Sequence, residues 1–105
     1  MRKVGFHSEA FEQFTDWAKQ DSQVFERLTR LIKETLRDPF GGIGKPEPLK
    51  HDLKGYWSRR ITDEHRLVYK VTTDMIIIAS CRAATNGSAA FPSSMNPWQK
   101  SRSMK

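Results

Sequence analysis

The sequence has very little cysteine and no long apolar stretch. Its 105 residues include one cysteine, Cys81, so an internal disulfide and a cysteine-rich metal cluster are both excluded. No apolar run reaches the length of a membrane span, and residues 1–11 lack the apolar region of a signal peptide. We therefore expect a cytoplasmic protein of one domain with one modest core, without a membrane partner, a metal or a cofactor.

Acidic residues are missing from the C-terminal segment, residues 83–105. Its Lys100, Arg102 and Lys105 supply +3 of the net charge of +6, and residues 1–82 supply the other +3. A sequence pI of 9.8 is in the range where a nucleic-acid partner is worth considering, although a solvated basic surface explains the charge equally well. Residues 83–105 are rich in Ala, Ser, Pro and Asn without apolar period, so we expect this tail to be disordered or loosely attached.

Two segments near the N-terminus have apolar residues at helical spacing. We expect Ser8 to cap the first helix and Asp21 or Ser22 to cap the second. The second helix should stop at Asp38, because Pro39 disfavours an α conformation in the residue before it. The short connection between them predicts an antiparallel pair whose apolar stripes form the core.

The remaining regular segments have β character, and a connector rich in glycine and proline separates them from the helices. This order predicts an α+β fold in which the two helices pack on one face of an antiparallel sheet. The expected strands are residues 2–6, 56–61, 66–71 and 75–81, with a further short strand near Leu49–Leu53.

The connector presents a carboxylate among cations. In the stretch KPEPLKH, Glu47 lies between Pro46 and Pro48, whose fixed φ angles stiffen the backbone. Lys45, Lys50 and His51 lie nearby in the sequence. A glutamate in such a setting can act as a general base, and the alternative is a surface glutamate in a rigid connector.

Three arginines lie around one predicted hairpin. Arg59 and Arg60 are on one strand and Arg66 is on the next, across the turn TDEH. Guanidinium groups gathered this closely repel one another unless an anion such as phosphate lies between them. The alternative is that Asp63 and Glu64 of the turn neutralise part of the cluster.

A carboxylate base with a cluster of cations suits metal-free cleavage of RNA. The base removes the proton of a 2′-hydroxyl, the cations stabilise the charged phosphorane, and an acid protonates the departing 5′-oxygen.

The stretch RDPFGGIGKPEPLKHDLKGYWSRRITDEHRLVYKV closely resembles the YoeB (Txe) toxins of bacterial type II toxin–antitoxin modules, within the RelE superfamily. The resemblance runs from Lys3 to about Arg82, which makes residues 1–82 a YoeB-like toxin domain and 83–105 a tail foreign to the family. It implies a small microbial-ribonuclease-like fold and cleavage of mRNA, chiefly in the ribosomal A site. It also implies inhibition by an antitoxin of the YefM type and a homodimer.

The same resemblance assigns roles to individual residues. Glu47 matches the general base and Arg66 matches the arginine that stabilises the phosphorane. Arg60 and Lys50 match basic residues near the scissile phosphate, and we expect Arg59 and Lys45 to contribute to phosphate binding as well.

The sequence departs from the family after Arg82. The family ends in Arg-Tyr-His-Tyr, whereas Ala83, Ala84 and Thr85 follow Arg82 here. A histidine titrates near neutrality and can protonate a leaving oxygen, which alanine cannot do. We therefore expect strongly reduced cleavage, unless His51 or His65 supplies the proton.

Two further functions remain open. A catalytically inactive protein of this fold can still bind the antitoxin or the ribosome. A structural domain with no RNA partner is the weaker alternative, because it leaves the arginine cluster and the Pro-Glu-Pro segment unexplained.

Overall fold

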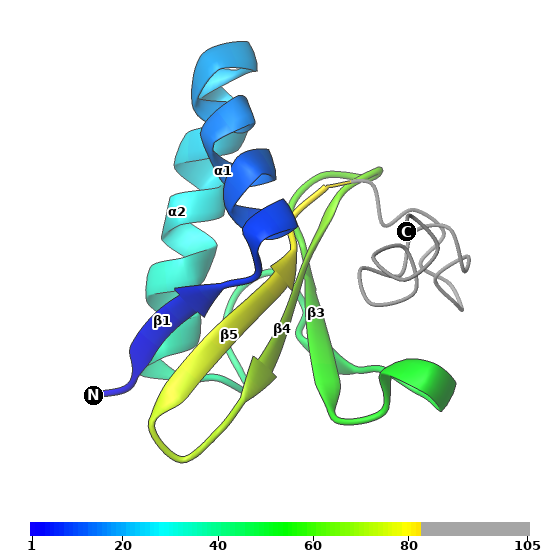
Figure 1. Ribbon diagram of the computed structural model, residues 1–105. Helices are drawn as coiled ribbons and strands as arrows, with labels where there is room; N and C mark the ends of the chain where they lie inside the picture. The colour runs from blue at the N-terminus through cyan, green and yellow to red at the C-terminus, as the bar shows by residue number, and fades with distance from the viewer. Residues whose placement is uncertain (83–105) are drawn as a thin grey trace, which may run out of the picture.

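A computed structural model describes residues 1–82 of the chain as two helices, five strands and one 3₁₀ turn (Figure 1). The elements in chain order are β1 (Lys3–Phe6), α1 (Ser8–Gln20), α2 (Ser22–Arg37), β2 (Glu47–Pro48), η1 (His51–Leu53), β3 (Tyr56–Arg60), β4 (Arg66–Val71) and β5 (Met75–Ser80).

The five strands form one mixed sheet in the order β1-β5-β4-β3-β2. The pairs β2–β3, β3–β4 and β4–β5 are antiparallel, and β1 pairs with β5 in parallel. The predicted α+β class is thus confirmed, but the sheet is not wholly antiparallel. The difference arises because β1 pairs with the last strand, which is remote in sequence.

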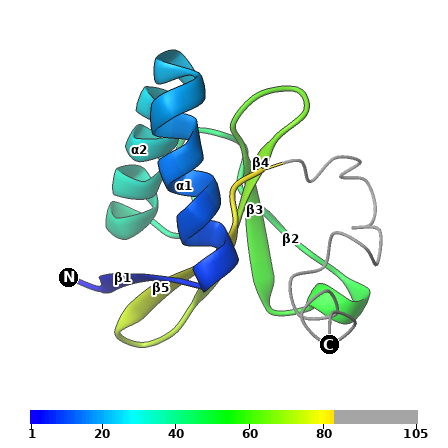
Figure 2. The ribbon, with the colours of Figure 1, turned by 45° about the horizontal axis from the view of Figure 1, so that its top comes forward.

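The two helices lie side by side on one side of the sheet (Figures 1 and 2). Helix α1 contributes Ala10 and Trp17 to the core, and α2 contributes Leu28 and Leu31. These side chains pack with residues of β4 and β5, namely Leu67, Tyr69, Ile76 and Ile78. The apolar stripes are therefore core, as predicted. None of the described helices is long and apolar enough to cross a membrane.

The helix boundaries follow local chemistry, with one exception. The Asp21 carboxylate accepts hydrogen bonds from the backbone N–H groups of Gln23 and Val24, which caps α2 as predicted. Helix α2 ends at Arg37, one residue before the predicted stop. The predicted cap at Ser8 is wrong, because Ser8 is already the first helical residue and His7 occupies the cap position.

The connector between α2 and β3 also differs from the prediction. The strand expected near Leu49–Leu53 is wrong, since His51–Leu53 form a 3₁₀ turn. The strand pairing occurs two residues earlier, at Glu47–Pro48. The predicted tail, Ala83–Lys105, lies outside the described residues.

The end of β5 is fixed to α1. The indole Nε1 of Trp17 donates to the Cys81 carbonyl at 2.9 Å, and the Cys81 N–H donates to the Gln13 side chain at 2.8 Å. The Arg82 guanidinium lies over the Trp17 ring, 4.3 Å from its centroid, and donates to Gln20 at 2.7 Å. These contacts determine where the chain leaves the sheet.

We expect the Cys81 thiol to be inert in the folded chain. The side chain is fully buried, and burial raises the pKa of Cys81 from 9.0 to about 12. The thiolate fraction at pH 8 is then about a thousandfold lower than in the unfolded chain. Titration with a disulfide reagent should give rapid labelling in denaturant and almost none without it; equal rates in both conditions would contradict the burial of this thiol.

Candidate active site on the far face of the sheet

The strand register brings Glu47, Arg60 and Arg66 to one face of the sheet. Glu47 of β2 is opposite Ser58 of β3, and Arg60 of β3 is opposite Arg66 of β4. Ser58 and Arg60 are two residues apart on one strand, so all of these side chains lie on the same face. This face of the sheet is the one turned away from the helices. Leu67, which follows Arg66 on β4 and so points to the other face, belongs to the core that the helices cover. We call this surface the far face.

The two arginines form a directly opposed pair of cations. Arg60 is exposed, Arg66 is half-buried, and Arg66 Nη1 lies 3.5 Å from Ser58 Oγ. The guanidinium of Arg66 therefore reaches toward the strand position that is paired with Glu47. From the spacing of strands and residues in a sheet, the Cα atoms of Glu47 and Arg66 are about 12 Å apart. A phosphodiester bound between these long side chains can contact both of them.

The turn carboxylates are not in ion-pair contact with this arginine pair in the described part of the chain. The ion pairs within residues 1–82 join Arg37 to Glu34 and His65 to Glu64. Neither involves Arg60 or Arg66, so within the described residues Asp63 and Glu64 form no ion pair with these two arginines. Two opposed guanidinium groups favour an anion between them.

Glu47 is exposed and is presented from an irregular connector. Lys45 and His51, on either side of it, have positive φ angles of 52° and 58°, which residues other than glycine seldom adopt. Such conformations persist only where the surroundings enforce them, and they occur often at functional sites. Lys45 and Lys50 are both exposed on this connector, within three residues of Glu47.

Arg59 does not belong to the far face, so its predicted contact with phosphate is wrong. The side chain is fully buried on the helix side of the sheet. Its guanidinium donates to the hydroxyl of Tyr69 and to the carbonyls of Ile43 and Asp38, at 3.1, 2.8 and 2.6 Å. Consecutive residues of a strand point to opposite faces, and Arg60 takes the outer one.

Three residues of the far face were missed by the sequence analysis: Tyr56, Ser58 and Lys70. Tyr56 is opposite Lys70 in the β3–β4 register, and the Lys70 ammonium lies over the Tyr56 ring, 5.6 Å from its centroid. An aromatic ring beside a cation suits stacking on a nucleobase. The alternation of Tyr56, Ser58 and Arg60 along β3 is the signal that points to this set.

Of the two histidines considered as replacement acids, His65 is directed away from the far face. The ring of His65 packs edge-on against Trp17, with centroids 4.8 Å apart, on the helix side of the sheet. His51 is exposed in the 3₁₀ turn after β2. Among residues 1–82, no three His, Cys, Asp or Glu side chains are grouped as a metal site would require.

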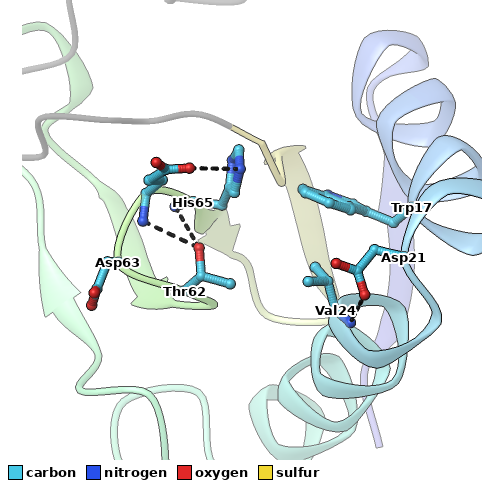
Figure 3. Close-up of a pocket in the computed structure, with 7 residues that line it drawn as sticks. Trp17, Asp21, Val24, Thr62, Asp63 and His65 are labelled. Carbon is cyan, nitrogen blue, oxygen red and sulfur yellow. Dashed lines mark hydrogen bonds and ion pairs between the residues drawn. The ribbon is translucent and has the colours of Figure 1, made fainter.

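A separate hollow of about 480 Å³ lies at the tip of the β3–β4 hairpin, beside the joint between α1 and α2 (Figure 3). Its lining residues are Trp17, Asp21, Val24, Thr62, Asp63, Glu64 and His65. The polar groups there have structural partners: Asp21 caps α2, and Thr62 Oγ1 accepts the N–H groups of Glu64 and His65 at 3.1 Å. We therefore assign this hollow to the scaffold.

The fold and the far face together define a class: small basic α+β proteins that present a carboxylate and an arginine pair on the helix-free side of a sheet. Comparisons with known proteins give the family. The family model described as "YoeB-like toxin of bacterial type II toxin-antitoxin system" matches residues 6–84.

Relatives of known name agree with this match. The chain is 51% identical over 80 residues to Toxin YoeB of Escherichia coli K12, covering 76% of this chain and 95% of that protein. It is 54% identical over 82 residues to Toxin RelK of Mycobacterium tuberculosis, covering 78% of this chain and 96% of that protein. This chain therefore belongs to the YoeB-like toxin family.

Solved structures share the fold. A YoeB/ParE toxin from Agrobacterium tumefaciens superposes with a TM-score of 0.75 at 41% identity, covering 77% of this chain and 96% of that one. The YoeB dimer from Staphylococcus aureus gives a TM-score of 0.73 at 43% identity, covering 77% of this chain and 94% of that one. YafQ from E. coli gives a TM-score of 0.65 at 18% identity, covering 79% of this chain and 93% of that one, and shows the fold alone.

We expect His65 to make the folded state less stable in acid. Burial lowers the pKa of His65 from its ordinary 6.5, and the nearby Arg82 lowers it further. A group with a lowered folded pKa contributes stability above the unfolded pKa and loses it as the pH falls. The free energy of unfolding is to be measured by urea denaturation at several pH values from 7.5 to 5. It should decrease as the pH is lowered through about 6.5, and the decrease should be less steep in His65→Gln. Equal slopes in the two proteins would contradict this assignment.

Proposed function

We propose that the chain is the toxin of a type II toxin–antitoxin module and acts as a ribosome-dependent endoribonuclease on mRNA in the A site. The observation that carries this proposal is the strand register, in which Glu47, Arg60 and Arg66 share the far face. A carboxylate beside an opposed pair of guanidinium groups offers a base and an oxyanion site to one phosphodiester.

The proposed reaction is an internal transfer of the phosphoryl group. Glu47 accepts the proton of the 2′-hydroxyl, and the 2′-oxygen forms a bond to the adjacent phosphorus. Arg66 and Arg60 stabilise the negative charge of the phosphorane, with Lys45 and Lys50 on the connector side. The bond from phosphorus to the 5′-oxygen then breaks, and the leaving oxygen takes up a proton, which leaves a 2′,3′-cyclic phosphate and a 5′-hydroxyl.

The last proton transfer is the weak step in this chain. Arg82 is near the end of the sheet that carries the arginine pair, since β5 runs antiparallel to β4 and Ser80 is already opposite Val68. The resembled toxins have Tyr-His-Tyr at the next positions, and this sequence has Ala83, Ala84 and Thr85. Loss of a general acid lowers a rate by roughly 10²- to 10⁴-fold. We therefore propose an active site with an intact base side and an impaired acid side.

The proposed partners follow from the relatives. A heterotetrameric YoeB–YefM toxin–antitoxin complex and a YoeB dimer are known from S. aureus, at 42% and 43% identity. We propose that this chain likewise binds an antitoxin of the YefM type, forms a homodimer and meets the ribosome in the cytoplasm.

A second candidate function is binding without catalysis. The observation that favours it is Ala84, at the position where the resembled toxins have histidine. Such a protein would bind the antitoxin or occupy the ribosome without cutting RNA.

Restoring the family ending should separate these two functions. We expect a variant that ends Arg82-Tyr-His-Tyr to cut mRNA on programmed ribosomes about 10²- to 10⁴-fold faster than the present chain, because it regains a general acid. The measurement is the single-turnover rate with both proteins in excess over ribosomes. Equal rates would show that the proton comes from another group.

Glu47→Gln tests the base in both proteins. The amide keeps the size of the side chain but cannot accept the proton, so we expect the cleavage rate to fall about 10²- to 10⁴-fold. Glu26→Gln, at an exposed position of α2, is the matched control and should leave the rate unchanged. If Glu47→Gln cut as fast as this control, the assignment of the base would fail.

A further inference from the structure

The connector of residues 38–48 carries Glu47 but has almost no regular structure of its own. It leaves α2 at Asp38 and joins the sheet at β2. Gly44, with φ +83°, lies so close to the core that an added Cβ would be 2.8 Å from Leu31 Cδ2. Its carbonyl accepts a hydrogen bond from the Arg60 N–H at 2.7 Å. The position of Glu47 therefore depends on how residues 38–44 are held.

Arg59 holds this segment at both of its ends. Arg59 Nη2 donates to the Asp38 carbonyl at 2.6 Å, and Nη1 donates to the Ile43 carbonyl at 2.8 Å. The Nε donates to the hydroxyl of Tyr69, which itself donates to the Pro39 carbonyl at 2.8 Å. Three carbonyls of one loop are thus bound to a single pair of side chains, which we call the clamp.

The clamp has few alternative arrangements. Arg59 and Tyr69 are both fully buried, so water does not replace the loop carbonyls around the guanidinium. A loop movement would leave a buried cation with unsatisfied N–H groups, which is costly. Burial also raises the pKa of Tyr69, although the nearby Arg59 acts in the opposite direction. The raised pKa keeps the hydroxyl protonated, so that it can donate to the Pro39 carbonyl.

We infer that Arg59, with Tyr69, is a positioning residue for the reaction proposed above, on which this inference rests. It does not touch the RNA. It fixes residues 38–44, which places Glu47 opposite Ser58 and within reach of the phosphate held by Arg60 and Arg66. A displacement of about 1 Å in a catalytic group can cost about 10²-fold in rate, so a loosened loop should slow the chemistry.

The test compares Arg59→Lys with Arg27→Lys in the full chain. Lysine keeps the charge but cannot bind three separate acceptors at once. Arg27 is the matched control, because its Nε donates to the Ile61 carbonyl at 2.6 Å and so joins a helix to the sheet without contacting the loop. The readouts are amide hydrogen exchange, melting temperature, and the maximal rate and half-saturating concentration for cleavage on programmed ribosomes.

We expect Arg59→Lys to loosen the connector selectively. The amides of Leu49 and Arg60, which bond to Tyr56 and Gly44, should exchange about tenfold faster or more. The amide of His7, which bonds to Ile78 at the other edge of the sheet, should change much less. The maximal cleavage rate should fall about 10- to 100-fold with little change in half-saturation. Arg27→Lys should change neither the exchange of the Leu49 and Arg60 amides nor the maximal cleavage rate, even if it lowers the melting temperature by the same amount.

The inference would be overturned by uniform changes in exchange, by an effect on half-saturation alone, or by an equal loss of rate in Arg27→Lys. Should Arg59→Lys not fold, Tyr69→Phe removes the bond to Pro39 and the acceptor of Arg59 Nε, and the same selective pattern is expected. Amide exchange does not depend on activity. The positioning role of Arg59 can therefore be refuted while Glu47→Gln still slows cleavage, and the role of Glu47 as base can be refuted while the exchange data still support the clamp.

Discussion

The fold depends on one buried cation. The Arg59 guanidinium contacts the end of α2 through the Asp38 carbonyl, the connector through Ile43 and the sheet through Tyr69. Removing an ionised group from water costs several kcal/mol, and good hydrogen bonds must offset that cost. The Asp38 carbonyl also lies at the negative end of the helix dipole of α2, which favours a cation there. These hydrogen bonds therefore stabilise the observed relative arrangement of helix, connector and sheet.

The alternation of a β-strand gives two adjacent arginines opposite roles. Because Arg59 points to the helix side, Arg60 must point to the far face, where it is opposite Arg66. The Arg60 backbone N–H meanwhile donates to the Gly44 carbonyl, so the same residue whose side chain lies on the far face also ties the connector to β3. The scaffold and the proposed active site are thus coupled through the dipeptide Arg59-Arg60.

The sequence predicts the helices and the three long strands well, because apolar spacing, the Asp21 cap and Pro39 are local signals. It does not predict which of Arg59 and Arg60 is buried. Charged residues are seldom buried, and only the assembled core supplies the carbonyls that make Arg59 an exception. The parallel pairing of β1 with β5 and the 3₁₀ turn at His51 depend in the same way on contacts remote in sequence.

The base side and the acid side of the proposed site are structurally independent. Glu47, Arg60 and Arg66 are placed by the pairing of β2, β3 and β4 together with the hydrogen bonds of Arg59 to the connector, and none of these contacts involves a residue beyond Arg82. The end of β5 is held by α1 through the hydrogen bond from Trp17 to the Cys81 carbonyl. In the proposed mechanism, the changed ending removes delivery of a proton to the leaving oxygen but leaves the surface that would bind RNA. An active toxin and an inactive binder of the same fold differ, in this arrangement, by the source of one proton.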